Sequence, residues 1–342
     1  MSIESRNKLI PVLEKTLNTR LVCYLTGDRM GMESQIGSDA VHRFYRHLES
    51  IGEVESISLF VYSRGGDTNV PWRLINLLRE YCSNLKVLVP YKAHSAATML
   101  CLGADEIVMG KMGELSSIDP SVANPFNPPD PMNPMARVPI GVEDVNAFRD
   151  LARRFGVDEK DSVQNAQVFM ALAQKVDPLA LGNVERSYNQ IRKLAVDLLG
   201  LHIDGEAEGK EKIDRIVSIL TERLYSHSHL INRREAQKIG LPITIAGSDL
   251  DALLWRLFSD FAEDMELEQP FNALKILGDR PTARIELKRA FIESRDLTDV
   301  FISGGAISRP MASQFPQGMN LPMNVQLQAA VQFDAEGWTR LR

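Results

Sequence analysis

A serine stands where a loop turns into a short helix with no polar face. The segment from Tyr91 to Asp105 reads YKAHSAATMLCLGAD, and Ser95 precedes its apolar run. Because the run from Ala96 to Leu102 is apolar all round, we expect this helix to be buried. A helix start offers unpaired N–H groups and the positive end of the helix dipole, which a developing oxyanion needs. Ser95 is therefore a candidate nucleophile, and a helix cap is the alternative.

A glycine pair thirty residues earlier offers further N–H groups. The strand-like stretch ISLFVY is followed by SRGGD, in which Gly65 and Gly66 allow a sharp turn with outward-pointing N–H groups. An oxyanion pocket would use the N–H of Gly65 or Gly66 together with that of Ala96. A plain tight turn is the alternative explanation of the pair.

The order of the elements brings the two loops together. A strand ends before the glycine pair, a helix with one apolar face is expected over 70–81, and a strand over 85–89 precedes the Ser95 helix. Both loops of such a β-α-β-α run lie outside the carboxyl ends of parallel strands. The sequence therefore predicts that Ser95 and the glycines lie at one edge of a sheet.

These motifs resemble the Clp-protease/crotonase superfamily. The likeness rests on the SRGGD turn, the AHSAA helix start and the stretch GADEIVMG, and it is strongest to signal-peptide-peptidase-like serine proteases, in particular the serine dehydrogenase proteinase family. The specific likeness covers residues 20–125, and a weaker one extends to 245. The resemblance implies a crotonase/Clp-protease-like α/β sheet with helical layers, peptide-bond cleavage through an acyl-enzyme on Ser95, and a homo-oligomer that encloses the sites.

The base that would accept the serine proton has two candidates. The resemblance implies Lys175, which stands roughly where signal-peptide-peptidase-like enzymes bring a lysine into a Ser-Lys dyad. A buried lysine can lose its proton near neutral pH, because desolvation lowers its pKa. His227 and His229 are the rivals, from a segment where the triad branch supplies its acid. A Clp-type triad is in doubt, because Asp119 stands near the place of the family histidine.

Composition and charge narrow the possible partners. The 342 residues carry a net charge of −6 without a basic stripe, so we expect no nucleic acid partner. The resemblance implies a polypeptide substrate. The three cysteines are scattered, which is typical of a reducing compartment. A polar N-terminus and the lack of an apolar stretch of about 18 residues predict a cytoplasmic protein without a membrane span. No metal or cofactor is expected.

Two parts are expected along the chain. Residues 1–245 should form the Clp-protease/crotonase-like domain, and residues 246–342 a small mixed appendage of a helix plus short strands. Between them the pattern is helical over 141–240. The stretch 120–139 contains seven prolines, and it is either a surface loop or a lid or subunit contact beside the site.

Two other functions remain open. An acyl-CoA hydratase or isomerase of the same fold would hold an enolate with paired N–H groups, but it would use a carboxylate base. A serine at position 95 argues against it. A catalytically silent oligomeric scaffold is the second alternative, since no base is assured by the sequence.

Overall fold

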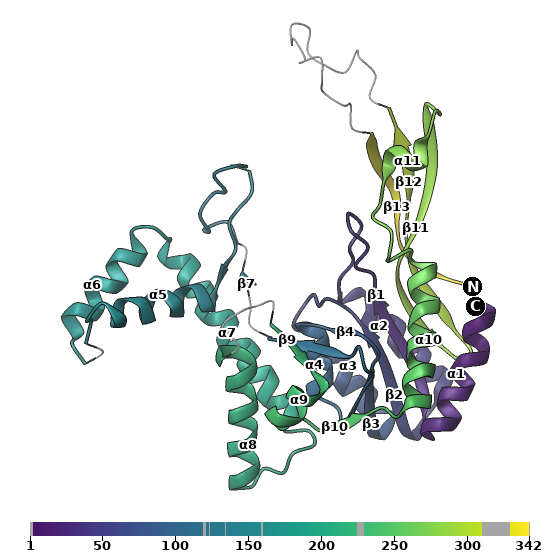
Figure 1. Cartoon of the computed structure of the whole chain (residues 1–342), viewed down its shortest axis with the longest axis horizontal. Coiled ribbons are helices and arrows are strands. Elements are labelled where there is room, and N and C mark those ends of the chain that lie inside the picture. Colours follow the sequence, from purple (N-terminus) through teal and green to yellow (C-terminus); the bar gives the residue numbers. More distant parts are fainter. Residues whose placement is uncertain are drawn as a thin grey trace, which may run out of the picture.

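An eight-stranded mixed sheet organises the molecule (Figure 1). The computed structural model describes residues 3–118, 121–122, 124–133, 135–158, 160–223, 229–309 and 329–341. In spatial order the strands are β10 (Ile243–Ile245), β5 (Glu106–Met109), β3 (Cys82–Val89), β2 (Val54–Tyr62), β1 (Arg20–Thr26), β11 (Thr282–Ser294), β12 (Thr298–Ser308) and β13 (Ala330–Arg340). The first five are parallel to one another, and the last three are antiparallel to their neighbours.

Smaller sheets and helices complete the described structure. The short strands are β4 (Lys92–Ala93), β6 (Glu114–Ser116) and β9 (Leu230–Asn232), which form one sheet, and β7 (Ser121–Val122) and β8 (Ile140–Gly141), which form another. The helices are α1 (Ile3–Leu17), α2 (Asp39–Ile51), α3 (Val70–Arg79), α4 (Ala96–Leu102), α5 (Val142–Arg154), α6 (Ser162–Ala173), α7 (Pro178–Leu199), α8 (Ala207–Ser218), the π-helix η1 (Ile219–Arg223), α9 (Arg233–Ile239), α10 (Ser248–Asp264) and α11 (Ala273–Leu277).

Helices cover both faces of the large sheet. Successive strand side chains point to opposite faces, so Leu59 and Val61 pack with α2, α3, α4 and α7, whereas Phe60 and Tyr62 pack with α1 and α10. A strand buried on both faces reads as a continuous apolar run, which explains the sequence ISLFVY. The predicted α/β sheet with helical layers is confirmed.

The C-terminal part continues the large sheet. β11 pairs antiparallel with β1, and β12 and β13 follow outward. These three strands contain 13, 11 and 11 residues, so the expectation of short strands was wrong. β12 pairs along its length with both β11 and β13, and the β11–β12 pairing contains one irregularity in register between Lys288 and Ala290. A division of the chain at 245/246 stays a prediction.

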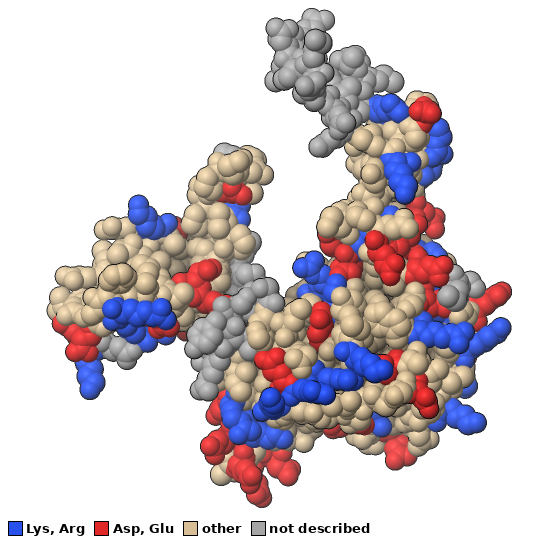
Figure 2. Space-filling view, viewed as in Figure 1, with Lys and Arg blue, Asp and Glu red and all other residues tan. Residues whose placement is uncertain are grey.

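An arm built from α5, α6 and the described residues 124–133 and 135–139 of the proline-rich stretch projects from the body (Figure 1). α6 contains no charged residue, and none of its side chains is buried. In the space-filling view, uncharged residues predominate on the arm, with several charged side chains among them (Figure 2). No helix in the described part of the chain is long and apolar enough to span a bilayer.

Candidate active site

Ser95 lies at the turn between β4 and α4, and its backbone is strained. Its φ of 51° and ψ of −114° fall outside the regions that side-chain-bearing residues favour. All seven residues of α4 are buried, as expected. Although Ser95 is the N-cap residue, its side chain makes no capping hydrogen bond. The serine therefore does not act as a helix cap, and a strained strand-to-helix turn is typical of exposed nucleophiles.

The glycine turn meets Ser95. Gly65 and Gly66 have φ values of 110° and 150°, which favour glycine. A Cβ placed on Gly65 would lie 2.8 Å from the Cβ of Ser95. A Cβ on Gly66 would lie 2.3 Å from the carbonyl oxygen of Ile36, so the turn is pressed between two backbone segments. A larger residue at either position would displace the loop or Ser95.

The hydrogen bonds of the turn distinguish the two glycines. The N–H of Gly65 donates to Ser63 Oγ at 2.9 Å, and Ser63 Oγ in turn lies 2.7 Å from Thr26 Oγ1. Among the described residues, no acceptor takes the N–H of Gly66 or that of Ala96. The sequence left Gly65 and Gly66 as equal candidates, and the geometry favours Gly66 as the partner of Ala96.

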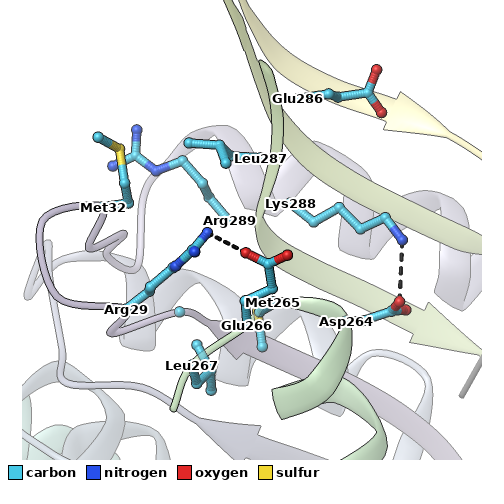
Figure 3. A pocket seen from close by; sticks show the side chains of 11 residues that line it. Arg29, Met32, Asp264, Met265, Glu266, Leu267, Glu286, Leu287, Lys288 and Arg289 are labelled. Atoms are coloured by element: carbon cyan, nitrogen blue, oxygen red, sulfur yellow. Dashed lines mark hydrogen bonds and ion pairs between the residues drawn. The ribbon is translucent and has the colours of Figure 1, made fainter. Parts of the chain in front are cut away.

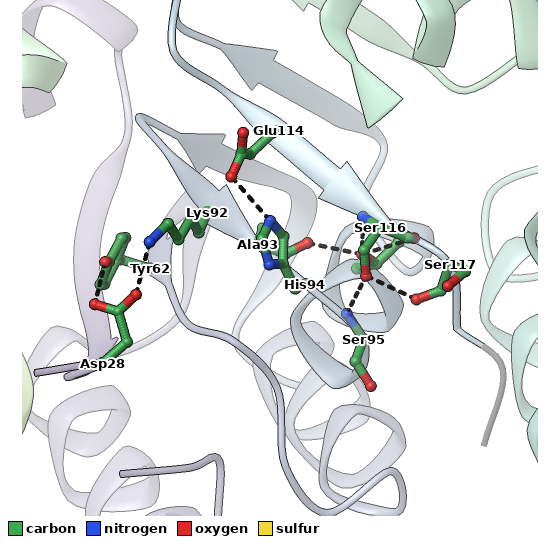
Figure 4. Close-up of polar contacts among 10 residues, drawn as sticks. Asp28, Tyr62, Lys92, Ala93, His94, Ser95, Glu114, Ser116 and Ser117 are labelled. Carbon is green, nitrogen blue, oxygen red and sulfur yellow. Dashed lines mark hydrogen bonds and ion pairs between the residues drawn. The ribbon is translucent and has the colours of Figure 1, made fainter. Parts of the chain in front are cut away.

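A second serine fixes the backbone of Ser95 (Figure 4). The N–H of Ser95 donates to Ser116 Oγ at 2.8 Å, and Ser116 Oγ donates to the carbonyl oxygen of Ser117 at 2.7 Å. Thr98 Oγ1 accepts the N–H of Ser116 at 3.1 Å, which ties β6 to α4. Sequence reasoning missed Ser116, because only the folded chain brings it to Ser95; the polar pair at 116–117 in a buried stretch was the available signal.

Two polar side chains of the segment that precedes Ser95, His94 and Lys92, each pair with a carboxylate. His94 Nε2 lies 3.1 Å from Glu114 Oε1, and Lys92 Nζ lies 2.7 Å from Asp28, which also accepts the hydroxyl of Tyr62 at 2.5 Å (Figure 4). Burial, with the cation of Lys92, lowers the pKa of His94 to about 4. Burial raises the pKa of Glu114. At neutral pH His94 is therefore a neutral imidazole beside Ser95.

The two candidate bases lie in different parts of the molecule. Lys175 is exposed and lies between α6 and α7, on the arm that projects away from α4 (Figure 1). His229 is half-exposed, and its Nε2 lies 2.8 Å from Glu235 Oε1. Within the described ranges, the hydroxyl of Ser95 forms no hydrogen bond to either residue. His227 and Asp119 lie outside the described residues.

A buried Ser-His-Asp group elsewhere has a different character. His47 Nδ1 lies 2.8 Å from Ser294 Oγ, and His47 Nε2 lies 3.2 Å from Asp299 Oδ2. All three residues are buried, so no substrate reaches them. This group joins α2 to the β11–β12 hairpin and has a structural role.

A small cleft beside α10 is lined by compensated charges (Figure 3). Its volume is about 210 Å³. Arg29 pairs with Glu266 at 2.6 Å, and Lys288 pairs with Asp264 at 3.2 Å. Because cations and anions alternate there, the cleft has no evident preference for a charged ligand. In the part of the chain that the structure describes, no cluster of three or more His, Cys, Asp or Glu residues is arranged to hold a metal ion.

Comparison with known proteins gives distant likenesses. No family model matches the chain. The uncharacterized protein MJ0137 of Methanocaldococcus jannaschii is 23% identical over 199 residues, which are 58% of this chain and 57% of that relative. The match therefore spans little more than half of the relative's length.

Three solved structures are similar in fold. ClpP1 from Listeria monocytogenes is 16% identical, with 70% of this chain and 99% of that chain covered and a TM-score of 0.36. The ClpP protease catalytic domain from Plasmodium falciparum is 11% identical, with 70% of this chain and 91% of that chain covered and a TM-score of 0.33. A protein described as an enoyl-CoA hydratase from Streptomyces coelicolor A3(2) is 13% identical, with 69% of each chain covered and a TM-score of 0.32. Likenesses this distant say nothing about activity, and membership of the serine dehydrogenase proteinase family stays a proposal.

Proposed function

We propose that this chain is a serine peptidase that cleaves peptide bonds through an acyl-enzyme on Ser95. The observation that carries the proposal is the state of Ser95: its hydroxyl makes no capping hydrogen bond at a helix start. Its backbone is strained, and the Gly65 turn packs against it. Strain of this kind costs about 1–3 kcal/mol and persists mainly where it serves a site.

The proposed reaction is acyl transfer. Ser95 Oγ attacks the carbonyl carbon of the scissile bond while a base takes the hydroxyl proton. The oxyanion accepts hydrogen bonds from the N–H groups of Gly66 and Ala96. As the tetrahedral intermediate collapses, the C–N bond breaks and the base gives its proton to the leaving amine. A water molecule, deprotonated by the same base, then hydrolyses the ester.

We propose Lys175 as the base in a Ser-Lys dyad, with His229 as its rival. Because Lys175 is exposed on the arm, it would serve Ser95 after a movement of the arm or from a neighbouring copy of the chain. His229 precedes Leu230, which pairs with Ser116, and Ser116 accepts the N–H of Ser95. Within one chain, the strand pairing therefore favours His229.

The arm supports assembly into a homo-oligomer. Three large side chains of α6 are 55–64% exposed: Val163, Phe169 and Met170. A helix of uncharged residues with no buried side chain gains stability when a second surface covers it. We propose that copies of this chain assemble through the arm and act on cytosolic polypeptides.

One observation favours the acyl-CoA hydratase or isomerase alternative. Glu114 is a half-buried carboxylate next to His94, and its pKa is raised by burial. A carboxylate in such a setting suits a general base that works on a carbon acid. The silent scaffold is the remaining alternative, since Ser95 Oγ has no hydrogen-bonded base in the described part of the chain.

A fluorophosphonate probe tests the proposal, because it labels only an activated serine. We expect labelling of the full chain and its loss in Ser95→Ala. Loss in Lys175→Ala with retention in His229→Ala identifies the lysine as the base, and the reverse pattern identifies the histidine. Ser56→Ala, at the end of β2 far from the glycine turn, is the control and should label normally.

Two results would overturn the peptidase proposal. Absence of labelling between pH 6 and 10, with the fold intact by circular dichroism, would favour the scaffold. Saturable binding and hydration of an enoyl-CoA thioester that Glu114→Gln abolishes and Ser95→Ala leaves intact would establish the hydratase.

A further inference from the structure

A second, larger cleft opens between the carboxyl end of α10 and the ends of β2 and β3. Its volume of about 770 Å³ lies within the range of ligand pockets, about 300–1,000 Å³. Four aromatic side chains line it: Tyr62, Tyr91, Trp255 and Phe258. The ring centroids are 4.7 Å apart for Tyr62 and Phe258, and 6.1 Å apart for Tyr91 and Trp255.

The aromatic surface of this cleft is incompletely covered by the chain itself. Trp255 is 40% exposed, although its ring lies 5.2 Å from that of Phe258. Large rings with an open face supply much of the contact energy in recognition sites, because they bury area at a low cost in conformational entropy. The cleft therefore offers an apolar floor for a ligand side chain.

The rim of the cleft is acidic. Four carboxylates belong to it: Asp28, Glu263, Glu266 and Glu268. Among the described lining residues the one cation is Lys92, which is engaged with Asp28 at 2.7 Å, while Arg29 from outside pairs with Glu266. α10 ends here without a basic residue in its last turn, so the negative end of its dipole adds to the charge of the glutamates.

One ring of the cleft already holds a cation. The ammonium nitrogen of Lys92 lies 4.8 Å from the centroid of Tyr91, within the range of a cation–π contact. Elsewhere in the described structure, no cation is placed over Trp255 or Phe258. The exposed face of Trp255 is therefore open to an apolar side chain of a ligand.

The distance between the aromatic floor and the acidic rim of the cleft sets the length of the ligand. Trp255 and Glu263 are eight residues apart on α10, which is about 12 Å along the helix axis. An extended polypeptide covers that distance with three or four residues at about 3.3 Å each. A small amine would touch one end only.

We propose that this cleft binds a polypeptide segment in which an aromatic or long aliphatic side chain lies a few residues from a lysine or arginine. The apolar side chain packs against Trp255 and Phe258, and the basic side chain pairs with the carboxylates at the end of α10. Tyr62 and α10 lie on the opposite face of the sheet from α4, which Ser95 begins. Binding in the cleft does not depend on the chemistry proposed for Ser95.

Peptide binding to the full-length Ser95→Ala chain tests the proposal without hydrolysis. We expect dye-labelled acetyl-Phe-Ala-Lys-Lys-amide to bind saturably in fluorescence anisotropy, and more weakly as salt is raised. The same peptide with glutamates in place of the lysines should bind at least tenfold more weakly. Ser259→Phe, which fills the cleft from α10, should weaken binding at least tenfold. Ser83→Phe, the same substitution at an exposed position at the opposite end of β3 from the cleft, should leave it unchanged.

A charge variant covers the case in which Ser259→Phe fails to fold. Glu263→Gln combined with Glu268→Gln changes exposed side chains only, and it should weaken binding of the lysine peptide several-fold while leaving the glutamate peptide unaffected. Equal affinity for the two peptides, or lysine-peptide binding that the glutamine pair leaves unchanged, would overturn the proposal. Complete displacement of the peptide by an equal concentration of tetramethylammonium would also overturn it, in favour of a site for small cations.

Discussion

The backbone strain at Ser95 can be tested through protein stability, independently of the chemistry of the hydroxyl. Glycine adopts a φ of 51° without a Cβ penalty, so Ser95→Gly should be more stable than Ser95→Ala, although both lack the hydroxyl. Glycine is also better than alanine at an N-cap position, whether or not the backbone is strained. Ser38 measures this capping effect alone, because it is the N-cap residue of α2 at an ordinary φ of −67° and forms no side-chain capping hydrogen bond. In urea unfolding, the glycine–alanine difference should be about 1 kcal/mol larger at Ser95 than at Ser38. Equal differences would mean that Ser95 is not strained.

Ser63 positions the oxyanion turn without touching a substrate. Its hydroxyl accepts the N–H of Gly65 and orients the peptide that precedes Gly66. Ser63→Ala should therefore slow fluorophosphonate labelling of Ser95 about tenfold, which corresponds to about 1.4 kcal/mol, the scale of one hydrogen bond. Labelling rates at sub-saturating probe measure this effect, and Ser56→Ala on the same strand is the matched control. An unchanged rate would remove Ser63 from the site.

At the scale of elements, the sequence predicts the features that local residue patterns determine and misses those that depend on tertiary contacts. The strand Glu106–Met109 and the helix from Val70 follow from apolar periodicity, and the cap at Asn232 follows from residue type. The meeting of the glycine turn with Ser95 follows from β-α-β-α topology. By contrast, Ser116 and the length of β11 depend on partners far away in the chain, which leave no local signal.

Arg6 joins three elements, and its loss should separate them. Its guanidinium is fully buried between Glu293 on β11, at 2.9 Å, and Asp260 and Asp264 on α10. Removing one partner of a buried ion pair leaves uncompensated charge, so Arg6→Met should lower the free energy of unfolding by about 3–5 kcal/mol. Adding Glu293→Gln should recover part of the loss in urea unfolding.

The control for Arg6 is an exposed pair on the same sheet. Arg284 pairs with Asp334 at the surface, where solvent screens the interaction, so Arg284→Met should leave the stability almost unchanged. If Arg6→Met were as mild as Arg284→Met, α1 would be held to the sheet by apolar packing alone.

At the scale of the whole molecule, buried histidines link stability to pH. Burial lowers the pKa of His47 to about 4, against the opposing effect of Asp299 and in line with that of Arg340. Burial also lowers the pKa of His94 to about 4 and that of His202 below its ordinary value. Each of these groups binds a proton more readily in the unfolded chain, whose histidines titrate near 6.5. Their contribution to stability is therefore complete above about pH 7 and declines as the pH falls from 6.5 to 4.

The expected loss for His47 alone is about 3 kcal/mol between these limits, because one pKa unit corresponds to about 1.4 kcal/mol. Urea unfolding at pH 7.5, 6.0 and 5.0 should show a falling free energy, and His47→Gln should reduce the slope while keeping a polar contact with Ser294. Carboxylates with lowered pKa values, such as Asp28 and Glu106, lose their contribution only near and below pH 4. The histidines and the carboxylates thus affect the free energy of unfolding in different pH ranges. A stability that stays constant from pH 7.5 to 5 and falls only below 4 would assign the acid sensitivity to the carboxylates instead of the histidines.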